Sequence, residues 1–83
     1  MTLDLLYFAW VRERIGLPRE RVETGAVTVA DLVVELAARE ERYALAFADL
    51  AGLRVALDQE LSEFAAPLAG VREVAFFPPM TGG

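Results

Sequence analysis

"TVADLVVELAAREER", Thr28–Arg42, is the clearest helix in the chain. Thr28 can accept a hydrogen bond from the backbone of Asp31, whose carboxylate can return one, which is a variant of the capping box. Glu35 and Arg39 stand four residues apart and would pair on the wet side of the helix. The apolar positions fall on one stripe, made by Val29, Leu32, Val33 and Leu36. The stretch therefore predicts an amphipathic helix with one face against a core.

Two strands are expected before this helix. The first is "LDLLYFAW", Leu3–Trp10, which is rich in aromatic and branched residues. A short helical turn follows it and is closed by Gly16, next to the break at Leu17-Pro18. The weakly alternating segment Arg19–Thr24 would form the second, more exposed strand, and Gly25 would then turn the chain towards the helix.

The segments after the helix read as one more helix and two or three strands. A short second helix is expected over 43–52, ended by Gly52, and the alternating segment Leu53–Leu57 predicts a strand. A turn then begins a short hairpin through Leu61, and 72–77 is the last strand. The order of elements predicts an α+β fold, with a mixed sheet of four to five strands and a helix packed across one face, as in the β-grasp architecture.

Alternation along the strands predicts which aromatic side chains are exposed. In the first strand Leu3, Leu5 and Tyr7 share one side, and Asp4, Leu6, Phe8 and Trp10 share the other. The charge of Asp4 marks its side as nearer to water. In the last strand Phe77 shares a side with Glu73. If these strands are neighbours, Phe8 and Phe77 meet on the face away from the helix. Exposed apolar groups of this kind mark a protein-docking surface, or they are scattered surface residues that need no account.

The composition excludes several classes of function. The 83 residues carry a net charge of −5 and include no His or Cys, and the sequence contains no Lys. An acidic chain is a poor binder of nucleic acid. The commonest general base, the thiol nucleophile and the thiolate or imidazole metal ligands are all missing, so no metal site and no self-sufficient enzyme is expected. The longest uncharged stretch, 74–83, is too short to span a bilayer, and no signal peptide is recognisable, so we expect a cytoplasmic protein without membrane contact.

The chain ends with "AFFPPMTGG", in which Pro78 and Pro79 cannot extend a ladder of backbone hydrogen bonds. The predicted domain therefore covers 1–77, and 78–83 form a flexible carboxy-terminal Gly-Gly tail. Gly82 and Gly83 have no side chains, so the tip can enter a narrow channel, while Met80 and Thr81 offer a partner a small apolar contact and a hydroxyl. The terminal carboxylate of Gly83 is a poor electrophile until it is joined to AMP. A frayed end is the alternative interpretation of a terminal Gly-Gly.

The motif "REVAFFPPMTGG" closely resembles the carboxy terminus of the small, sulfur-carrying subunits of molybdopterin synthase. The opening "LLYFAWVRE" and the segment "ALDQEL" are similar to that family's first strand and central hairpin. The resemblance covers most of the chain in order and implies the ubiquitin-like β-grasp fold. Asp58 stands where the family often has Asn, and "GVREV" is one residue longer than the usual bend, which leaves the detail of the hairpin open.

The resemblance also implies a mechanism and partners. A ubiquitin-activating-like adenylyltransferase would adenylate Gly83, consuming ATP and magnesium, and a sulfur donor protein would convert the adenylate to a thiocarboxylate. The large synthase subunit, in a heterotetramer with the small one, would pass the sulfur to cyclic pyranopterin monophosphate. No cofactor would be bound permanently. Phe8, Leu61 and Phe77 match family positions that contact these enzymes, and Arg12 matches a recurring Arg that is otherwise a solvated surface residue.

Three other functions fit parts of the same pattern. Another β-grasp sulfur carrier, serving thiazole synthesis or tRNA thiolation, would share the Gly-Gly chemistry. A ubiquitin-like protein modifier would be joined to partner lysines through Gly83, although this chain has no Lys on which to build chains. A plain interaction module with an unused tail is the remaining alternative.

Overall fold

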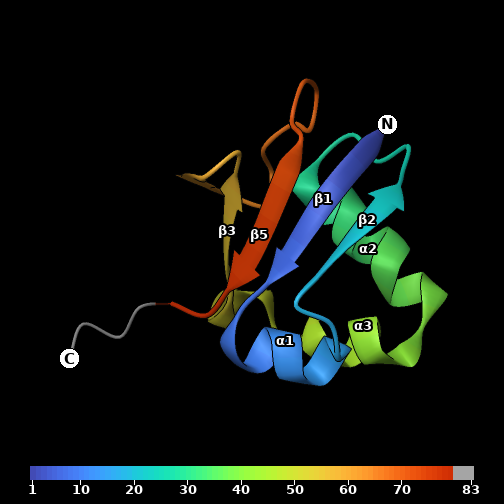
Figure 1. Cartoon of the computed structure of the whole chain (residues 1–83), viewed down its shortest axis with the longest axis vertical. Helices are drawn as coiled ribbons and strands as arrows, with labels where there is room; N and C mark the ends of the chain where they lie inside the picture. Colours follow the sequence, from blue (N-terminus) through green and yellow to red (C-terminus); the bar gives the residue numbers. More distant parts are fainter. Residues whose placement is uncertain (80–83) are drawn as a thin grey trace.

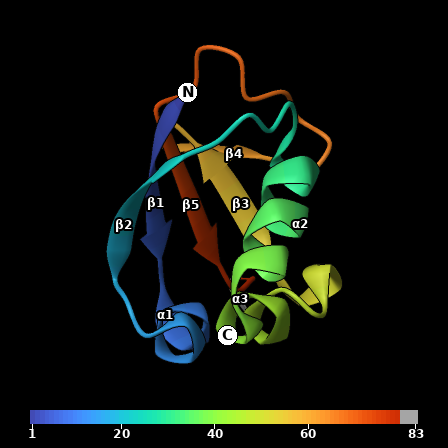
Figure 2. The ribbon, with the colours of Figure 1, turned by 90° about the vertical axis from the view of Figure 1, so that its right-hand side faces the viewer.

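The protein folds as a five-stranded mixed sheet with a helix across one face (Figures 1 and 2). The structure, a computed structural model, describes residues 1–79. The elements in chain order are β1 (Thr2–Tyr7), α1 (Ala9–Ile15), β2 (Arg19–Glu23), α2 (Val29–Arg39), α3 (Glu41–Ala46), a 3-10 helix (Leu50–Gly52), β3 (Arg54–Leu57), β4 (Glu60–Ser62) and β5 (Glu73–Phe77). The predicted α+β class and strand number are confirmed.

The first and last strands lie side by side at the centre of the sheet. The strand order is β2-β1-β5-β3-β4, in which β1 and β5 are parallel and the other pairs are antiparallel. Both central strands therefore run towards α1, as Figure 1 shows. Because β1 and β5 run in the same direction, the residues that follow β1 and those that follow β5 lie at the same end of the sheet.

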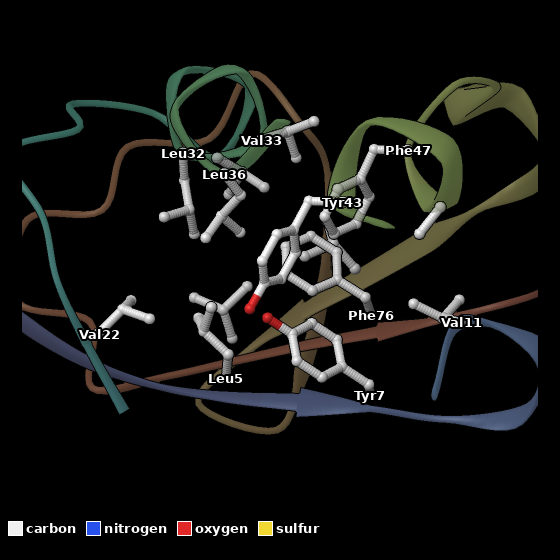
Figure 3. Packing of buried hydrophobic residues seen from close by; sticks show 14 of the residues in the cluster. Leu5, Tyr7, Val11, Val22, Leu32, Val33, Leu36, Tyr43, Phe47 and Phe76 are labelled. Atoms are coloured by element: carbon white, nitrogen blue, oxygen red, sulfur yellow. The ribbon is translucent and has the colours of Figure 1, made fainter. Parts of the chain in front are cut away.

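Helix α2 begins as the sequence predicts. The Thr28 hydroxyl accepts a hydrogen bond from the Asp31 backbone N–H at 3.2 Å, and the Thr28 N–H donates to the Asp31 carboxylate at 3.2 Å, so the capping box is complete. Arg39 pairs with Glu35 at 3.2 Å. The expected apolar stripe is buried against the sheet, as Figure 3 shows for Leu32, Val33 and Leu36.

Several predicted boundaries are wrong. The first strand ends at Tyr7 rather than at Trp10, because Phe8 is the N-cap of α1 and the backbone turns at Ala9, whose φ is +52°. The long helix ends at Arg39 rather than at Arg42, because Glu40 is extended and serves as the N-cap of α3. The second helix correspondingly starts at Glu41, and a 3-10 turn occupies the end of its predicted range.

The core lies between the sheet and the helices. The inward side chains of the central strands, Leu3, Leu5, Tyr7, Val74 and Phe76, are all at most 1% exposed. The Phe76 ring lies 4.9 Å from that of Phe47 and stacks at 6.0 Å on that of Tyr7, between centroids (Figure 3). Alternation thus assigned the inner face of both central strands correctly.

Candidate functional site

The face of the sheet opposite α2 carries an apolar row. No described helix covers this face, towards which Figure 1 looks. Register places Leu6 opposite Ala75, Ala75 opposite Ala56, and Ala56 opposite Leu61, so one row crosses β1, β5, β3 and β4. Directly opposed residues in a sheet share a face. The side chains of this row, together with Phe8 and Phe77, are called the open face below.

Phe8 is the most exposed aromatic residue of the open face, with 49% of its surface accessible. Its N–H donates to the Phe76 carbonyl at 3.1 Å, which continues the β1–β5 pairing by one residue and sets Phe8 beside Phe77. The left-handed Ala9 then turns the chain into α1. The predicted exposure of Phe8 is confirmed, and the two strands that carry Phe8 and Phe77 are neighbours as the prediction required, whereas Phe77 is half-buried rather than fully exposed.

Leu61 lies on the same face and is 71% exposed. It belongs to β4, two strands away from β5, or roughly 10 Å at the usual spacing of neighbouring strands. The three residues expected to bind partners, Phe8, Leu61 and Phe77, therefore share one face. Their binding role stays a prediction. Arg12 is exposed on α1, one helical turn after Phe8.

Two buried aromatic residues lie next to Phe8 and Phe77 on the inner side of the sheet. Tyr7 and Phe76, the neighbours of Phe8 and Phe77 in sequence, point inward and stack on each other. The Tyr7 hydroxyl donates to the Glu20 carboxylate at 2.8 Å, and the Tyr43 hydroxyl donates to the same oxygen at 2.5 Å. Burial, then the bond to Glu20, raises the pKa of Tyr7 far above its usual value, and the same causes raise the pKa of Tyr43 to about 12. Both phenols therefore stay neutral donors at physiological pH.

The tail begins beside the open face. β5 ends at Phe77, as predicted, and Pro78 and Pro79 follow without secondary structure. Since neither proline has an N–H, the ladder cannot continue along them. The expected tail residues Met80, Thr81, Gly82 and Gly83 lie outside the described residues.

Several features of this site were not found from the sequence alone. Alternation had already placed Leu6 with Phe8, but only the strand order joins Leu6 and Ala75 to Ala56 and Leu61 in one row. Arg54, which lies opposite Phe77, was likewise not singled out. Trp10 was expected on the same side as Phe8, but it belongs to α1, where the Arg14 guanidinium lies 4.4 Å from its ring centroid.

Neither a metal-binding cluster nor a membrane-spanning helix is present in the described part of the chain. Residues 1–79 contain no group of three or more His, Cys, Asp or Glu residues that could hold a metal ion. No helix among them has the length and apolar character needed to cross a membrane.

Comparisons with known proteins agree with this geometry. The molybdopterin synthase sulfur carrier subunit of Escherichia coli strain K12 is 43% identical over 81 residues, covering 98% of this chain and 99% of that one. The Haemophilus influenzae protein of the same name is 36% identical over the same coverage. The crystal structure of SAMP1 from Haloferax volcanii superposes with a TM-score of 0.77, at 25% identity and full coverage of both chains. The family model described as the ThiS family matches residues 5–83, from the first strand through the final glycine, and the chain belongs to that family.

Proposed function

We propose that this chain is the sulfur carrier subunit of a molybdopterin synthase and serves molybdenum cofactor biosynthesis. The observation that carries this proposal is the 43% identity to the Escherichia coli carrier over nearly the whole of both chains. The second relative carries the same name. In this role the large subunit of the synthase is the partner, and the open face is the surface that meets it.

The reacting group is the carboxylate of Gly83. One of its oxygens attacks the α-phosphorus of ATP on a ubiquitin-activating-like adenylyltransferase, so that pyrophosphate leaves and an acyl-adenylate forms. A sulfur atom at the oxidation level of hydrosulfide, delivered by a donor protein, then attacks the carbonyl carbon. AMP leaves with the former carboxylate oxygen. The product is a thiocarboxylate, whose sulfur bonds to cyclic pyranopterin monophosphate in the large subunit. Water then cleaves the bond between this sulfur and the Gly83 carbonyl carbon, which restores the carboxylate.

The composition supports a carrier whose partner proteins supply the catalytic groups. The chain has no His, Cys or Lys to act as base, nucleophile or Schiff-base former, so its partners supply those groups. ATP and magnesium are consumed on the activating enzyme rather than held by this chain. Glycine at the last two positions lets the backbone approach a reacting centre closely.

Mass spectrometry of the intact protein tests the carrier role. Carrier isolated from cells with an active pathway should contain a form about 16 Da heavier, with the change confined to Gly83, since one oxygen becomes sulfur. That form, mixed with the large subunit and pterin precursor, should yield molybdopterin.

Gly83→Ala should fold normally and transfer less sulfur. A confirmed thiocarboxylate that yields no molybdopterin would favour a carrier for thiazole or tRNA thiolation, and conjugates on other proteins would favour a modifier.

Docking through the open face is tested separately with Phe8→Asp. This variant places a charge within the proposed interface and should weaken binding of the large subunit by at least tenfold. Val34→Asp is the matched control, because Val34 is 69% exposed but lies on α2, behind the sheet. Equal affinity of Phe8→Asp and the unmodified chain in a calorimetric titration would remove the open face from the interface.

A further inference from the structure

We propose that Arg54 makes the open face selective for a partner surface that carries a carboxylate beside its apolar pocket. This inference rests on the proposed docking role of the open face and names the chemistry of the partner there. Arg54 is a charged residue that lies beside apolar residues, close to the end of β5.

Arg54 is the cross-strand neighbour of Phe77. It lies opposite Phe77 in the antiparallel β3–β5 register, so the two side chains leave the same face of the sheet. Opposed side chains of this kind have Cβ atoms about 5 Å apart. Any surface that covers Phe77 therefore also covers or closely approaches the Arg54 guanidinium.

The guanidinium of Arg54 has most of its donors available. One N–H, at Nη1, donates to the Leu53 carbonyl at 3.0 Å, and no ion pair joins Arg54 to another of the described residues. The guanidinium has five N–H donors, so up to four can bind a partner. The side chain is exposed on β3.

Acidic residues of the same face lie at its other end. Asp4 already pairs with Arg21 at 3.0 Å, and Glu73 stands four residues before Phe77, or roughly 13 Å along the strand. That separation exceeds the screening length of about 8 Å at physiological ionic strength. Arg54 is thus a local positive charge on a chain whose net charge is −5.

Burial of this charge sets the chemistry of the partner. Covering a guanidinium with a purely apolar surface would remove its water without replacing the hydrogen bonds, which is costly. A carboxylate accepts two parallel N–H bonds from the planar guanidinium and restores them. The same charge pair accelerates association and disfavours basic surfaces, so it adds specificity to an otherwise apolar contact.

The test is the association of Arg54→Glu with the large synthase subunit, measured from low to high salt. Arg72→Glu is the matched control: it changes the net charge equally, and Arg72 is also exposed but lies five residues before Phe77, at the far end of β5. We expect Arg54→Glu to weaken binding at least tenfold, chiefly through a lower association rate and a loss of salt dependence. Arg72→Glu should stay within twofold. Arg54→Lys, which keeps the charge, should recover most of the association rate.

The outcomes separate this inference from the docking proposal. If Phe8→Asp abolishes binding while Arg54→Glu binds like the unmodified chain, the carboxylate is absent and the inference is overturned, although the open face still docks. Equal weakening by Arg54→Glu and Arg72→Glu would also overturn it, because only net charge would then matter. If Phe8→Asp has no effect, the docking proposal itself fails. Recovery of Arg54→Glu by reversing one acidic residue of the large subunit to Arg would identify the partner carboxylate.

Discussion

At the residue scale, Asp58 fixes the end of the sheet that lies away from the tail. Asp58 and Gln59 have φ values of +49° and +71°, so both residues of the β3–β4 turn are left-handed, the conformation typical of a two-residue hairpin of type I′. One Asp58 carboxylate oxygen accepts hydrogen bonds from the backbone N–H groups of Arg72 and Glu73, each at 3.0 Å. The turn is therefore tied to the start of β5, the strand that presents Phe77.

Asp58→Ala should destabilise the protein by about 2 kcal/mol. The substitution removes both charge-assisted bonds and places a residue without a local hydrogen-bonding side chain in the left-handed region. Asp58→Asn is the control, since Asn tolerates that conformation and still accepts through its amide oxygen, and its cost should stay below about 1 kcal/mol. Urea denaturation followed by circular dichroism measures both. Similar unfolding midpoints for the Ala variant and the unmodified chain would show that the two contacts contribute nothing.

At the element scale, Glu20 joins three elements that are distant in sequence. Its carboxylate, on the edge strand β2, accepts from Tyr7 of β1 and from Tyr43 of α3. Arg42 extends the contact by donating to the Ile15 carbonyl at the end of α1, at 2.8 Å. These bonds hold α1 and α3 against the end of the sheet where Phe8 turns outward. The element boundaries there depend on polar contacts as well as on apolar packing.

The stability of this arrangement should fall at alkaline pH. Tyr7 and Tyr43 have pKa values raised above the usual value, that of Tyr43 to about 12, so the folded protein holds both phenolic protons more tightly than the unfolded chain does. Their contribution is complete below pH about 10 and declines as the pH rises above that value; the part from Tyr43 is lost through about 12, and the part from Tyr7 at still higher pH. No other side chain titrates in this window, because the chain has two tyrosines, no Lys and no Cys.

Urea midpoints measured at intervals between pH 8 and 12 give the stability, and tyrosinate absorbance recorded in parallel gives the ionisation of the two tyrosines. Tyr43→Phe is the control, since it removes one titrating group and should make the alkaline decline less steep. Tyrosinate forming in the folded protein at the usual pKa of about 10 would contradict the expectation.

The sequence predicts the elements better than their ends, and the end of β1 shows the reason. Alternation and helical spacing depend on local pattern, so α2, the inner face of β1 and the outward Phe8 follow directly from them. The end of β1 does not, because the run from Leu6 to Trp10 is apolar throughout. Where it turns is decided by pairing with β5, through the Phe8 to Phe76 bond. The open face similarly needs the strand order, which brings residues some fifty or more positions apart together.

At the scale of the whole molecule, the core of the described chain ends before Pro78. Every buried hydrophobic residue of the described chain lies between Leu3 and Phe76, and the two prolines after Phe77 end the sheet. Phe8, Phe77 and Arg54 lie close to the point where β5 ends. Under the proposed function, the open face would hold the large subunit close to the point where β5 ends.

A chain shortened to end at Pro79 should therefore fold and bind but carry no sulfur. Its free energy of unfolding should lie within about 0.5 kcal/mol of the full-length value, as for surface changes, whereas Phe76→Ala should lose about 4 kcal/mol because it opens a cavity in the core. The shortened chain retains the open face, so it should compete with the intact carrier for the large subunit. Denaturation curves and a synthase assay with added shortened chain measure these effects. A shortened chain that unfolds far more easily would show that the last four residues belong to the folded body, and one that still supplies sulfur would place the reacting group elsewhere than at Gly83.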